Sequence, residues 1–294
     1  MIDKTKEFLN KHKQTQKWLA MNLSVSDAQI STFLAGSYKG NVQNLEQKVK
    51  NFIENFISND TKSQDLNFFV ENDNTESVNY IMRRAIEKNK LSVIIGSAGY
   101  GKTTAIKKFI ENRPEALFIK ANNLFSTKDF LEILCTRLNI KIESRGSAMF
   151  NSIVLTLQRA NKFIVIDEAE WLKDKTLDMV RNIWEESNTP IILSGTLILN
   201  QNLTGIRGQL DYVNSRINGR CKLEKVNEAT IKAVCGNFQI DNKAIDLVMT
   251  LTNGNFRTVS NLLDESKSFI NDFNAEEIIT VEIVEEVSKM AFGL

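Results

Sequence analysis

The sequence is poor in the residues that several classes of site require. His12 is the only histidine in 294 residues and lies far along the chain from every candidate catalytic or metal-binding residue, which argues against Ser-His-Asp and Cys-His catalysis and against multi-histidine metal sites. Cys135, Cys221 and Cys235 are odd in number and never spaced as C-x-x-C. Neither a disulfide framework nor a structural zinc site is therefore expected.

Long apolar runs and net charge are also lacking. The longest apolar stretches, such as 91–95 and 163–166, are far shorter than the ~20 residues of a membrane-spanning helix. The first residues mix lysines with acidic residues and contain no apolar segment typical of a signal peptide. We therefore expect a cytoplasmic protein without a membrane segment. The net charge is only +1, so nucleic acid would have to bind to a local basic face.

Length and pattern predict one medium domain and one small domain. Residues 1–58 read as wholly helical, and the polar residues 59–76 read as a linker. In 77–226, short apolar runs alternate with helical patterns, which indicates a parallel doubly wound sheet. These runs are 91–95, 117–119, 163–166, 190–193 and 221–223. Amphipathic helices follow in 227–294 and predict a helical lid on the α/β core.

A phosphate loop is the strongest motif. The segment GSAGYGKT fits G-x-x-x-x-G-K-[ST] and lies between an expected strand and an expected helix. Its amides and the helix N-terminus would hold the phosphates of ATP, with Lys102 on the β- and γ-phosphates and Thr103 on Mg²⁺. Tyr100 is either a nucleotide contact or an exposed aromatic without a special role. The expected nucleotide-binding residues here are Gly96, Ser97, Ala98, Gly99, Tyr100, Gly101, Lys102, Thr103 and Thr104.

Two adjacent carboxylates, Asp167 and Glu168, follow the apolar run 163–166. In an open α/β sheet that end of a strand faces the ligand crevice. Because successive strand residues point to opposite sides, Asp167 can serve the hydrated Mg²⁺ while Glu168 polarises the attacking water. An acidic pair alone is commonly a solvated turn, but together with the phosphate loop it favours a catalytic site.

The phosphate loop, the DEAE segment at 167–170 and the helical lid together resemble AAA+ ATPases. Four further segments are similar, in order and spacing, to the Mu B family of bacteriophage transposition proteins. They are LSGT at 193–196, NLTG at 202–205, SRI at 215–217 and NGNFR at 253–257. The resemblance covers nearly the whole chain, since that family also begins with a small helix-turn-helix domain.

The resemblance implies roles for individual residues. Thr196 would be the sensor-1 residue, although the family member compared has an amide there. Arg216 would be an arginine finger acting on a neighbouring subunit, with Arg220 as the alternative, and Arg257 would be the sensor-2 residue on the phosphates. Each arginine has an alternative reading as a surface side chain lying over a helix. An arginine finger acting in trans requires an oligomer.

Residues 14–40 resemble a helix-turn-helix of the lambda-repressor type, with Ser26 or Asp27 capping the second helix. The face offered to DNA carries no arginine to recognise guanine, so weak sequence specificity is expected. The alternative is a small helical domain for protein contacts. The candidate DNA-binding residues are Lys17, Ala28, Gln29, Ser31, Thr32 and Lys39. Lys107, Lys108, Lys141 and Arg145 would form a second DNA surface or would simply be solvated.

The resemblance implies a transposition accessory ATPase. ATP-bound subunits would assemble as an oligomer or helical filament on double-stranded DNA with little sequence preference and would recruit and stimulate a transposase. Slow, DNA-stimulated hydrolysis would then dismantle the assembly. Two alternatives share the same core: a helicase-loader-like or remodelling ATPase, and a transcriptional regulator whose nucleotide site is a switch.

Overall fold

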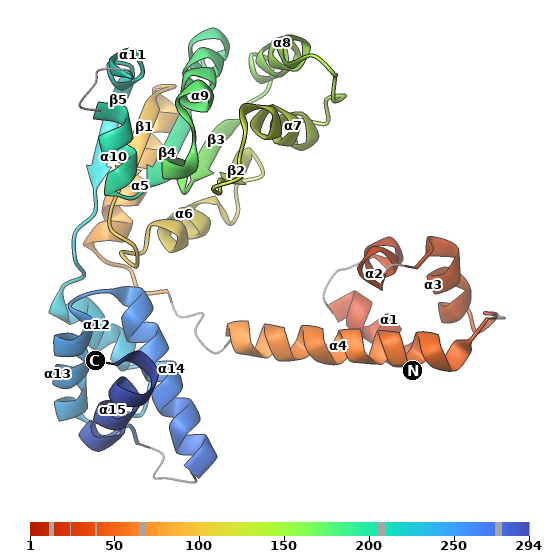
Figure 1. The fold of residues 1–294 in the computed structure, drawn as a ribbon, viewed down its shortest axis with the longest axis vertical. Coiled ribbons are helices and arrows are strands. Elements are labelled where there is room, and N and C mark those ends of the chain that lie inside the picture. The colour runs from red at the N-terminus through yellow and green to blue at the C-terminus, as the bar shows by residue number, and fades with distance from the viewer. Residues whose placement is uncertain are drawn as a thin grey trace. The chain divides into compact units, whose positions relative to one another are not determined.

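The computed structural model describes residues 1–11, 15–23, 25–38, 40–64, 69–204, 210–273 and 278–293. The chain divides into two compact units, Met1–Asn67 and Phe68–Leu294. The first unit is helical, whereas the second contains a sheet, the helices that cover it and a further group of helices (Figure 1). Among the described helices, none is long and apolar enough to cross a membrane.

The described part of the first unit forms helices α1 (Ile2–Lys11), α2 (Gln16–Leu23), α3 (Asp27–Leu34) and α4 (Val42–Gln64). Buried apolar side chains from all of these helices, among them Leu19, Ile30 and Phe33, form one core. A capping box starts α3: Ser26 Oγ accepts from the Gln29 amide at 3.3 Å, and Gln29 Oε1 accepts from the Ser26 amide at 2.9 Å. Of the two expected caps, Ser26 rather than Asp27 is therefore the one used.

The linker expected over residues 59–76 is shorter in the structure. Helix α4 continues to Gln64, and α5 (Asp73–Glu87) begins at an Asn72 cap whose side chain accepts from the Thr75 amide at 3.0 Å. The polar residues 59–64 contain neither glycine nor proline, so no strong helix breaker ends α4 there. Polarity alone marked this segment as a linker, and polarity does not end a helix.

The second unit is built on five parallel strands in the order β2–β3–β4–β1–β5. The bounds are β1 (Leu91–Ile95), β2 (Ala116–Lys120), β3 (Phe163–Asp167), β4 (Ile191–Gly195) and β5 (Ile217–Lys222). This sheet confirms the expected α/β class. Strand β5 begins four positions before the expected run 221–223 because its residues alternate between partly buried and exposed, so most of it lacks a continuous apolar signal.

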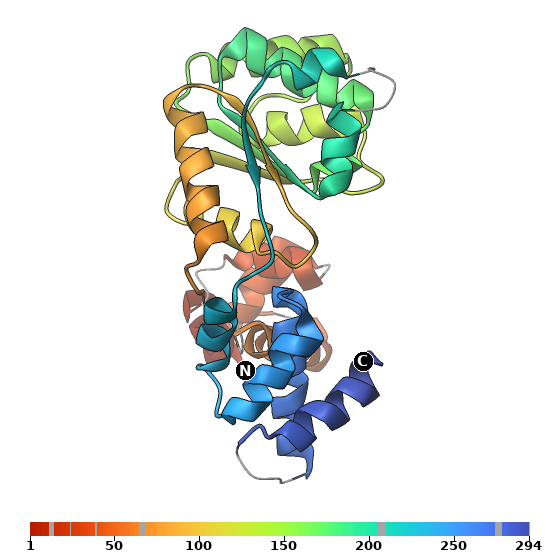
Figure 2. The same ribbon diagram turned by 90° about the vertical axis from the view of Figure 1, so that its left-hand side faces the viewer.

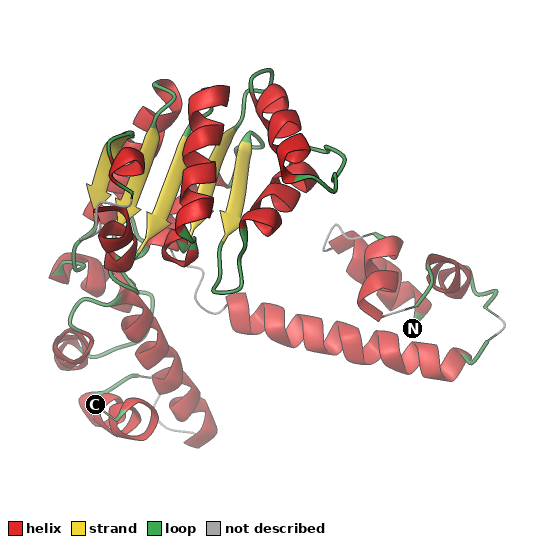
Figure 3. Ribbon diagram, turned by 45° about the horizontal axis from the view of Figure 1, so that its top comes forward, coloured by secondary structure: helices red, strands yellow, loops and turns green. Residues whose placement is uncertain are grey.

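Helices cover both faces of the sheet (Figure 3). Ile164 and Ile166 pack on one face, whereas Phe163 and Val165 pack on the other, against α5 and α6 (Lys102–Ile110). The first face is covered by α7 (Thr127–Arg137), α8 (Gly146–Leu157), α9 (Asp174–Ser187), α10 (Leu197–Thr204) and α11 (Asp211–Asn214). Burial on both faces explains why the central strands read as continuous apolar runs.

A separate apolar core lies in the C-terminal helices, drawn in blue in Figure 2. These are α12 (Glu228–Cys235), α13 (Asn242–Thr252), α14 (Phe256–Phe273), α15 (Val281–Val287) and the π-helical turn η2 (Ser288–Phe292). Val248, Val259 and Leu263 are fully buried within this core. The expected helical lid is therefore a small helical bundle following the sheet.

Candidate functional site

The phosphate loop connects β1 to α6 and depends on two glycines in the left-handed region. Gly99 has φ +81° and Gly101 has φ +84°, which L side chains rarely adopt. A Cβ added at Gly99 would also lie 1.9 Å from Asn255 Oδ1 in the lid. Gly99 is therefore required both for its own backbone conformation and for the close approach of the lid.

Lys102 opens α6 and folds back over the loop. Its Nζ donates hydrogen bonds to the Gly96 carbonyl at 2.6 Å and to the Ser97 carbonyl at 3.0 Å. Burial lowers the pKa of Lys102, while the nearby Glu170 and Asp167 carboxylates act in the opposite direction. A phosphate would offer this partly buried ammonium a charged partner in place of neutral carbonyls.

Asp167 ends β3 and is 1% exposed. Its Oδ2 accepts a hydrogen bond from Thr103 Oγ1 at 2.7 Å, while Oδ1 is buried with no hydrogen-bond partner among the described residues. Oxygen ligands of this kind suit Mg²⁺, which is commonly held by one or two carboxylates together with substrate phosphates. Thr103 and Asp167 are thus the residues that fit a magnesium ion.

Glu168 occupies a strained position directly after β3. Its φ of 54° and ψ of 37° are left-handed, which is uncommon for a residue with a side chain. Its carboxylate forms an ion pair with Lys120 Nζ at 3.0 Å, and the hydrogen bond to Glu168 raises the pKa of Lys120. The sequence analysis missed Lys120. No local sequence pattern indicates Lys120, because the lysine reaches this sheet edge through the strand register that pairs it with Asp167.

Glu170 links the acidic segment to Thr196. Its Oε1 accepts from the Thr196 amide at 3.3 Å, and its Oε2 is a second buried oxygen with no partner among the described residues. A Cβ added at Gly195 would lie 2.6 Å from that Oε2, so Gly195 leaves the space that the carboxylate uses. No role was predicted for Glu170, although it lies within the acidic motif.

The start of helix α14 docks on the phosphate loop. Asn255 Oδ1 accepts from the amides of Arg257 at 3.0 Å and Thr258 at 3.3 Å, which caps the helix. Asn255 Nδ2 donates to the Ala98 carbonyl at 3.1 Å, and the Phe256 amide donates to the Gly99 carbonyl at 3.0 Å. These contacts place Arg257 at the phosphate loop.

These residues enclose a pocket of about 320 Å³. It is lined by Ala98, Gly99, Gly101, Lys102, Thr103, Thr104, Asp167, Glu168, Glu170, Gly195, Thr196, Phe256, Arg257 and Ser260. Most of the predicted nucleotide, metal and catalytic residues are therefore together. Gly96, Ser97 and Tyr100 instead line a hollow on the β5 side of the loop. Tyr100 is partly buried against the core beneath α5, and a contact with nucleotide stays a prediction.

Comparisons with known proteins agree with the fold described above. A family model described as an AAA domain matches residues 83–203. The Mu-like prophage FluMu DNA transposition protein B of Haemophilus influenzae is 23% identical over 86% of this chain and 90% of its own length. The ATP-dependent target DNA activator B of Escherichia phage Mu is 23% identical over 81% of this chain and 77% of its own. The chain has an AAA+ core and resembles the Mu B proteins.

Solved structures support the same fold. The ORC2 protein of Aeropyrum pernix, solved in ADPNP–ADP complexes, superposes with a TM-score of 0.56 at 14% identity, over 74% of this chain and 66% of that one. At this identity the likeness establishes the AAA+ fold alone. Within that fold, the pocket lies where the carboxyl ends of β1, β3 and β4 meet the lid.

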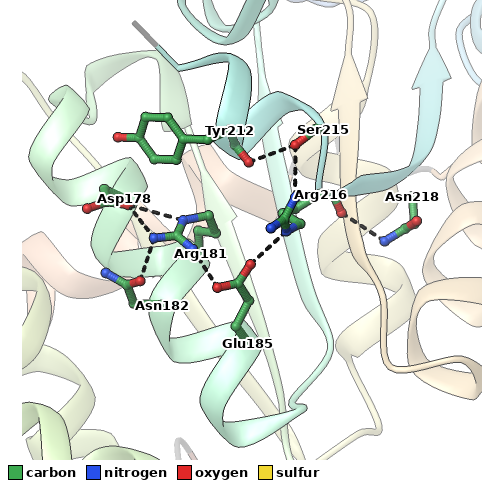
Figure 4. A network of polar contacts seen from close by, with 8 residues as sticks. All are labelled: Asp178, Arg181, Asn182, Glu185, Tyr212, Ser215, Arg216 and Asn218. Atoms are coloured by element: carbon green, nitrogen blue, oxygen red, sulfur yellow. Dashed lines mark hydrogen bonds and ion pairs between the residues drawn. The ribbon is translucent and has the colours of Figure 1, made fainter.

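Two predicted AAA+ residues, Arg216 and Arg220, are not among the residues that line this pocket. Arg216 Nε donates to Glu185 Oε1 on α9 at 2.8 Å (Figure 4). Arg220 Nη1 donates to Asn200 Oδ1 at 3.2 Å and also binds Asn214. Either arginine would have to act on the nucleotide of another subunit.

The predicted DNA-binding residues of the first unit are spread over α2 and α3. Lys17, Ala28, Ser31 and Thr32 are exposed, whereas Lys39 lies outside the described residues. Gln29 is half-buried, and both ends of its side-chain amide are in use. Its Oε1 accepts from the Ser26 backbone in the α3 capping box, and its Nε2 donates to Tyr38 Oη at 3.3 Å. Gln29 is therefore less available to DNA than its exposed neighbours.

The residues proposed for a second DNA surface on the AAA+ core already have partners in part. Lys108 pairs with Glu111 at 2.8 Å, and Lys141 pairs with Glu143 at 3.6 Å. Exposed pairs of this kind are weak, so they hold the lysines only loosely.

The docking of α14 on the phosphate loop yields a first prediction. Asn255→Ala removes a helix cap and the contact with Ala98, so we expect a loss of about 1 kcal/mol of unfolding free energy and a several-fold weaker nucleotide affinity. Asn227→Ala is the matched control, because Asn227 caps α12 through Thr230 without lining the pocket. Urea unfolding should show a lower stability for both variants. Nucleotide titration should show a weaker affinity for Asn255→Ala alone. Equal affinities in the two variants would contradict the coupling.

The buried oxygen of Asp167 yields a second prediction. Asp167→Asn keeps an acceptor for Thr103 but removes the charge, so the gain in nucleotide affinity on adding Mg²⁺ should fall by roughly tenfold or more. Asp174→Asn, at the start of α9, should leave this gain intact. Titrations with Mg²⁺ and with a chelator measure the difference. If Mg²⁺ raises the nucleotide affinity of Asp167→Asn as much as that of the wild type, Asp167 is not a magnesium ligand.

Proposed function

We propose that this protein is an ATP-dependent, DNA-binding ATPase of a transposition system. The observation that carries the proposal is the single pocket in which Lys102, Thr103, Asp167, Glu168 and Arg257 meet. This set combines a phosphate loop, carboxylates for a metal and for water, and an arginine from the lid. We infer that the protein acts in the cytoplasm.

In the first step the chain binds ATP. Lys102 leaves the loop carbonyls and contacts the β- and γ-phosphates, while the α6 N-terminus contributes its partial positive charge. Thr103 and Asp167 would hold Mg²⁺, which would neutralise phosphate charge when bound. Arg257 reaches the phosphates from the lid, and Asn255 ties the loop to α14.

In the second step Glu168 accepts a proton from the attacking water, which requires its ion pair with Lys120 to open. Thr196 acts as sensor 1 beside Glu170, and Arg257 and a neighbour's Arg216 stabilise the charge that develops as the γ-phosphate leaves. Arg220 is the alternative to Arg216. Turnover is slow and stimulated by DNA, because the neighbour is supplied by assembly on DNA.

The DNA and transposase parts of the proposal come from the resemblance to proteins named as DNA transposition proteins and ATP-dependent target DNA activators. ATP-bound subunits assemble as an oligomer or helical filament on double-stranded DNA and deliver it to a transposase. The N-terminal helix-turn-helix contributes Lys17, Ser31 and Thr32, with low sequence specificity because no arginine lies on that face. Hydrolysis then releases the DNA.

Binding of labelled duplex DNA with and without ATP tests this function. Wild-type protein should bind at least about tenfold more tightly with ATP, and the affinity should fall steeply with salt.

Lys102→Ala should lose nucleotide binding and the ATP-dependent part of DNA binding, since it removes a charge-assisted contact. Glu168→Gln should remain on DNA with ATP but not turn over. Lys175→Ala is the control, because Lys175 is an exposed lysine on α9 outside the proposed nucleotide and DNA contacts. Equal DNA affinity with and without ATP in the wild type would refute the proposal.

The ion pair between Lys120 and Glu168 gives a further prediction. Lys120→Met frees the Glu168 carboxylate, so ATP turnover without DNA should rise several-fold and stimulation by DNA should shrink. Lys128→Met is the matched control, because Lys128 is another exposed lysine paired with a carboxylate, Glu132, at 3.5 Å. Phosphate release measured with and without DNA tests this. Unchanged or reduced DNA-free turnover in Lys120→Met would mean that the pair does not restrain Glu168.

A further inference from the structure

A charged network joins α9 to α11 on the face of the sheet opposite α5 and α6. Figure 4 shows its members, which are Asp178, Arg181, Asn182, Glu185, Tyr212, Ser215, Arg216 and Asn218. Two of these side chains are arginines and two are carboxylates that bind them. The network contains Arg216, so its geometry determines how that arginine is presented.

Arg181 is the fixed centre of the network. Its side chain is only 18% exposed and binds Asp178 Oδ1 through Nε at 3.1 Å and Nη2 at 2.9 Å. Nη2 also donates to Asn182 Oδ1 at 2.6 Å, and Nη1 binds Glu185 Oε2. The guanidinium lies 5.3 Å from the ring centroid of Tyr212 on α11. Arg181 thereby fixes both the α9–α11 contact and one oxygen of Glu185.

Glu185 divides its carboxylate between two arginines. Oε2 is occupied by Arg181, so only Oε1 remains for Arg216, which it binds through Nε at 2.8 Å. A carboxylate with both oxygens free would grip a guanidinium bidentately. Here Glu185 contacts Arg216 through Nε alone. The outer edge of the guanidinium, which carries the two Nη groups, keeps donors for another acceptor although Nη1 also binds Ser215.

Further contacts fix the rest of Arg216. Its Nη1 donates to Ser215 Oγ at 3.2 Å, and its carbonyl accepts from Asn218 Nδ2 at 2.8 Å. The side chain nevertheless remains 50% exposed, and its hydrogen bonds to other described residues use two of the five N–H donors of a guanidinium. A side chain held in this way loses little further rotamer freedom when it meets a phosphate.

We propose that Glu185 is the positioning residue of Arg216, and that it presents the outer edge of the guanidinium to the nucleotide of a second copy of this chain. This inference rests on the proposed function, in which Arg216 acts in trans. Glu185 pairs with both Arg181 and Arg216. Because Arg181 neutralises part of the charge of the carboxylate, Glu185 orients Arg216 without neutralising it fully. In a single chain Arg216 binds the carboxylate of Glu185. In the assembly it would keep this contact and also bind the γ-phosphate of the neighbouring chain.

ATP turnover of the full chain assembled on duplex DNA tests the inference. Glu185→Ala should lower kcat about tenfold, because Arg216 would no longer be oriented toward the neighbouring nucleotide. KM for ATP should not change, because Glu185 does not line the ATP pocket of its own chain. Glu185→Gln keeps an oxygen acceptor for Arg216 Nε and should recover most of the loss. Glu186→Ala, the next residue on α9 and exposed, is the control and should match the wild type. A Glu185→Ala, Arg216→Ala double variant should be no slower than Arg216→Ala.

A mixing experiment separates positioning from damage to the fold. Glu168→Gln subunits carry an intact Arg216 but do not hydrolyse ATP, whereas Glu185→Ala subunits have an intact pocket. Mixed on DNA, they should turn over several-fold faster than the sum of the two measured separately. A mixture that gives only that sum, or Glu185→Ala at wild-type rate while Arg216→Ala is slow, overturns the role of Glu185. Wild-type turnover in Arg216→Ala would instead overturn the trans arginine of the proposed function.

Discussion

The hydrogen bond between Thr103 and Asp167 is the constraint on which the site depends. It joins residues 64 positions apart and ties the first turn of α6 to the end of β3. Because Thr103 follows Lys102 and Asp167 precedes Glu168, this one contact sets the phosphate loop against both carboxylates. The central strands beneath it are buried on both faces, which gives the contact a rigid base.

Several features of the pocket are unfavourable for folding and are explained by preparation for a ligand. Glu168 has a left-handed backbone, and Asp167 Oδ1 and Glu170 Oε2 are buried without partners among the described residues. Lys102 meanwhile occupies neutral carbonyls of its own loop. A magnesium–triphosphate group would satisfy the unpartnered oxygen of Asp167 and the ammonium together, so its binding would stabilise the folded chain.

The sequence was informative where function depends on neighbours along the chain. The phosphate loop, the adjacent Asp167 and Glu168, and the apolar runs of the central strands were all predicted from local pattern, and the fold class is confirmed. The contact between Asn255 and Ala98 spans 157 positions, and nothing local to either residue indicates it. Lys120 could be placed only once strand register was known. Nothing local to Glu185 indicates its contact with Arg216, which lies 31 positions further along the chain.

Two arginines with different surroundings suggest how one chain can report on two nucleotides. Arg257 lies in the pocket of its own chain and is tied to the phosphate loop through the α14 cap. Arg216 lies outside that pocket on a network built by α9 and α11. In the proposed assembly the first arginine senses the subunit's own ATP and the second completes the site of the next subunit.

The most direct test is the structure of the protein assembled on duplex DNA with a non-hydrolysable ATP analogue and Mg²⁺, determined by electron cryo-microscopy. The account predicts a triphosphate held by Lys102, with magnesium beside Thr103 and Asp167, Arg257 of the same chain on the phosphates and Arg216 of the adjacent chain at the γ-phosphate. A nucleotide bound away from the Thr103–Asp167 contact, or a pocket that stays empty under these conditions, would contradict it.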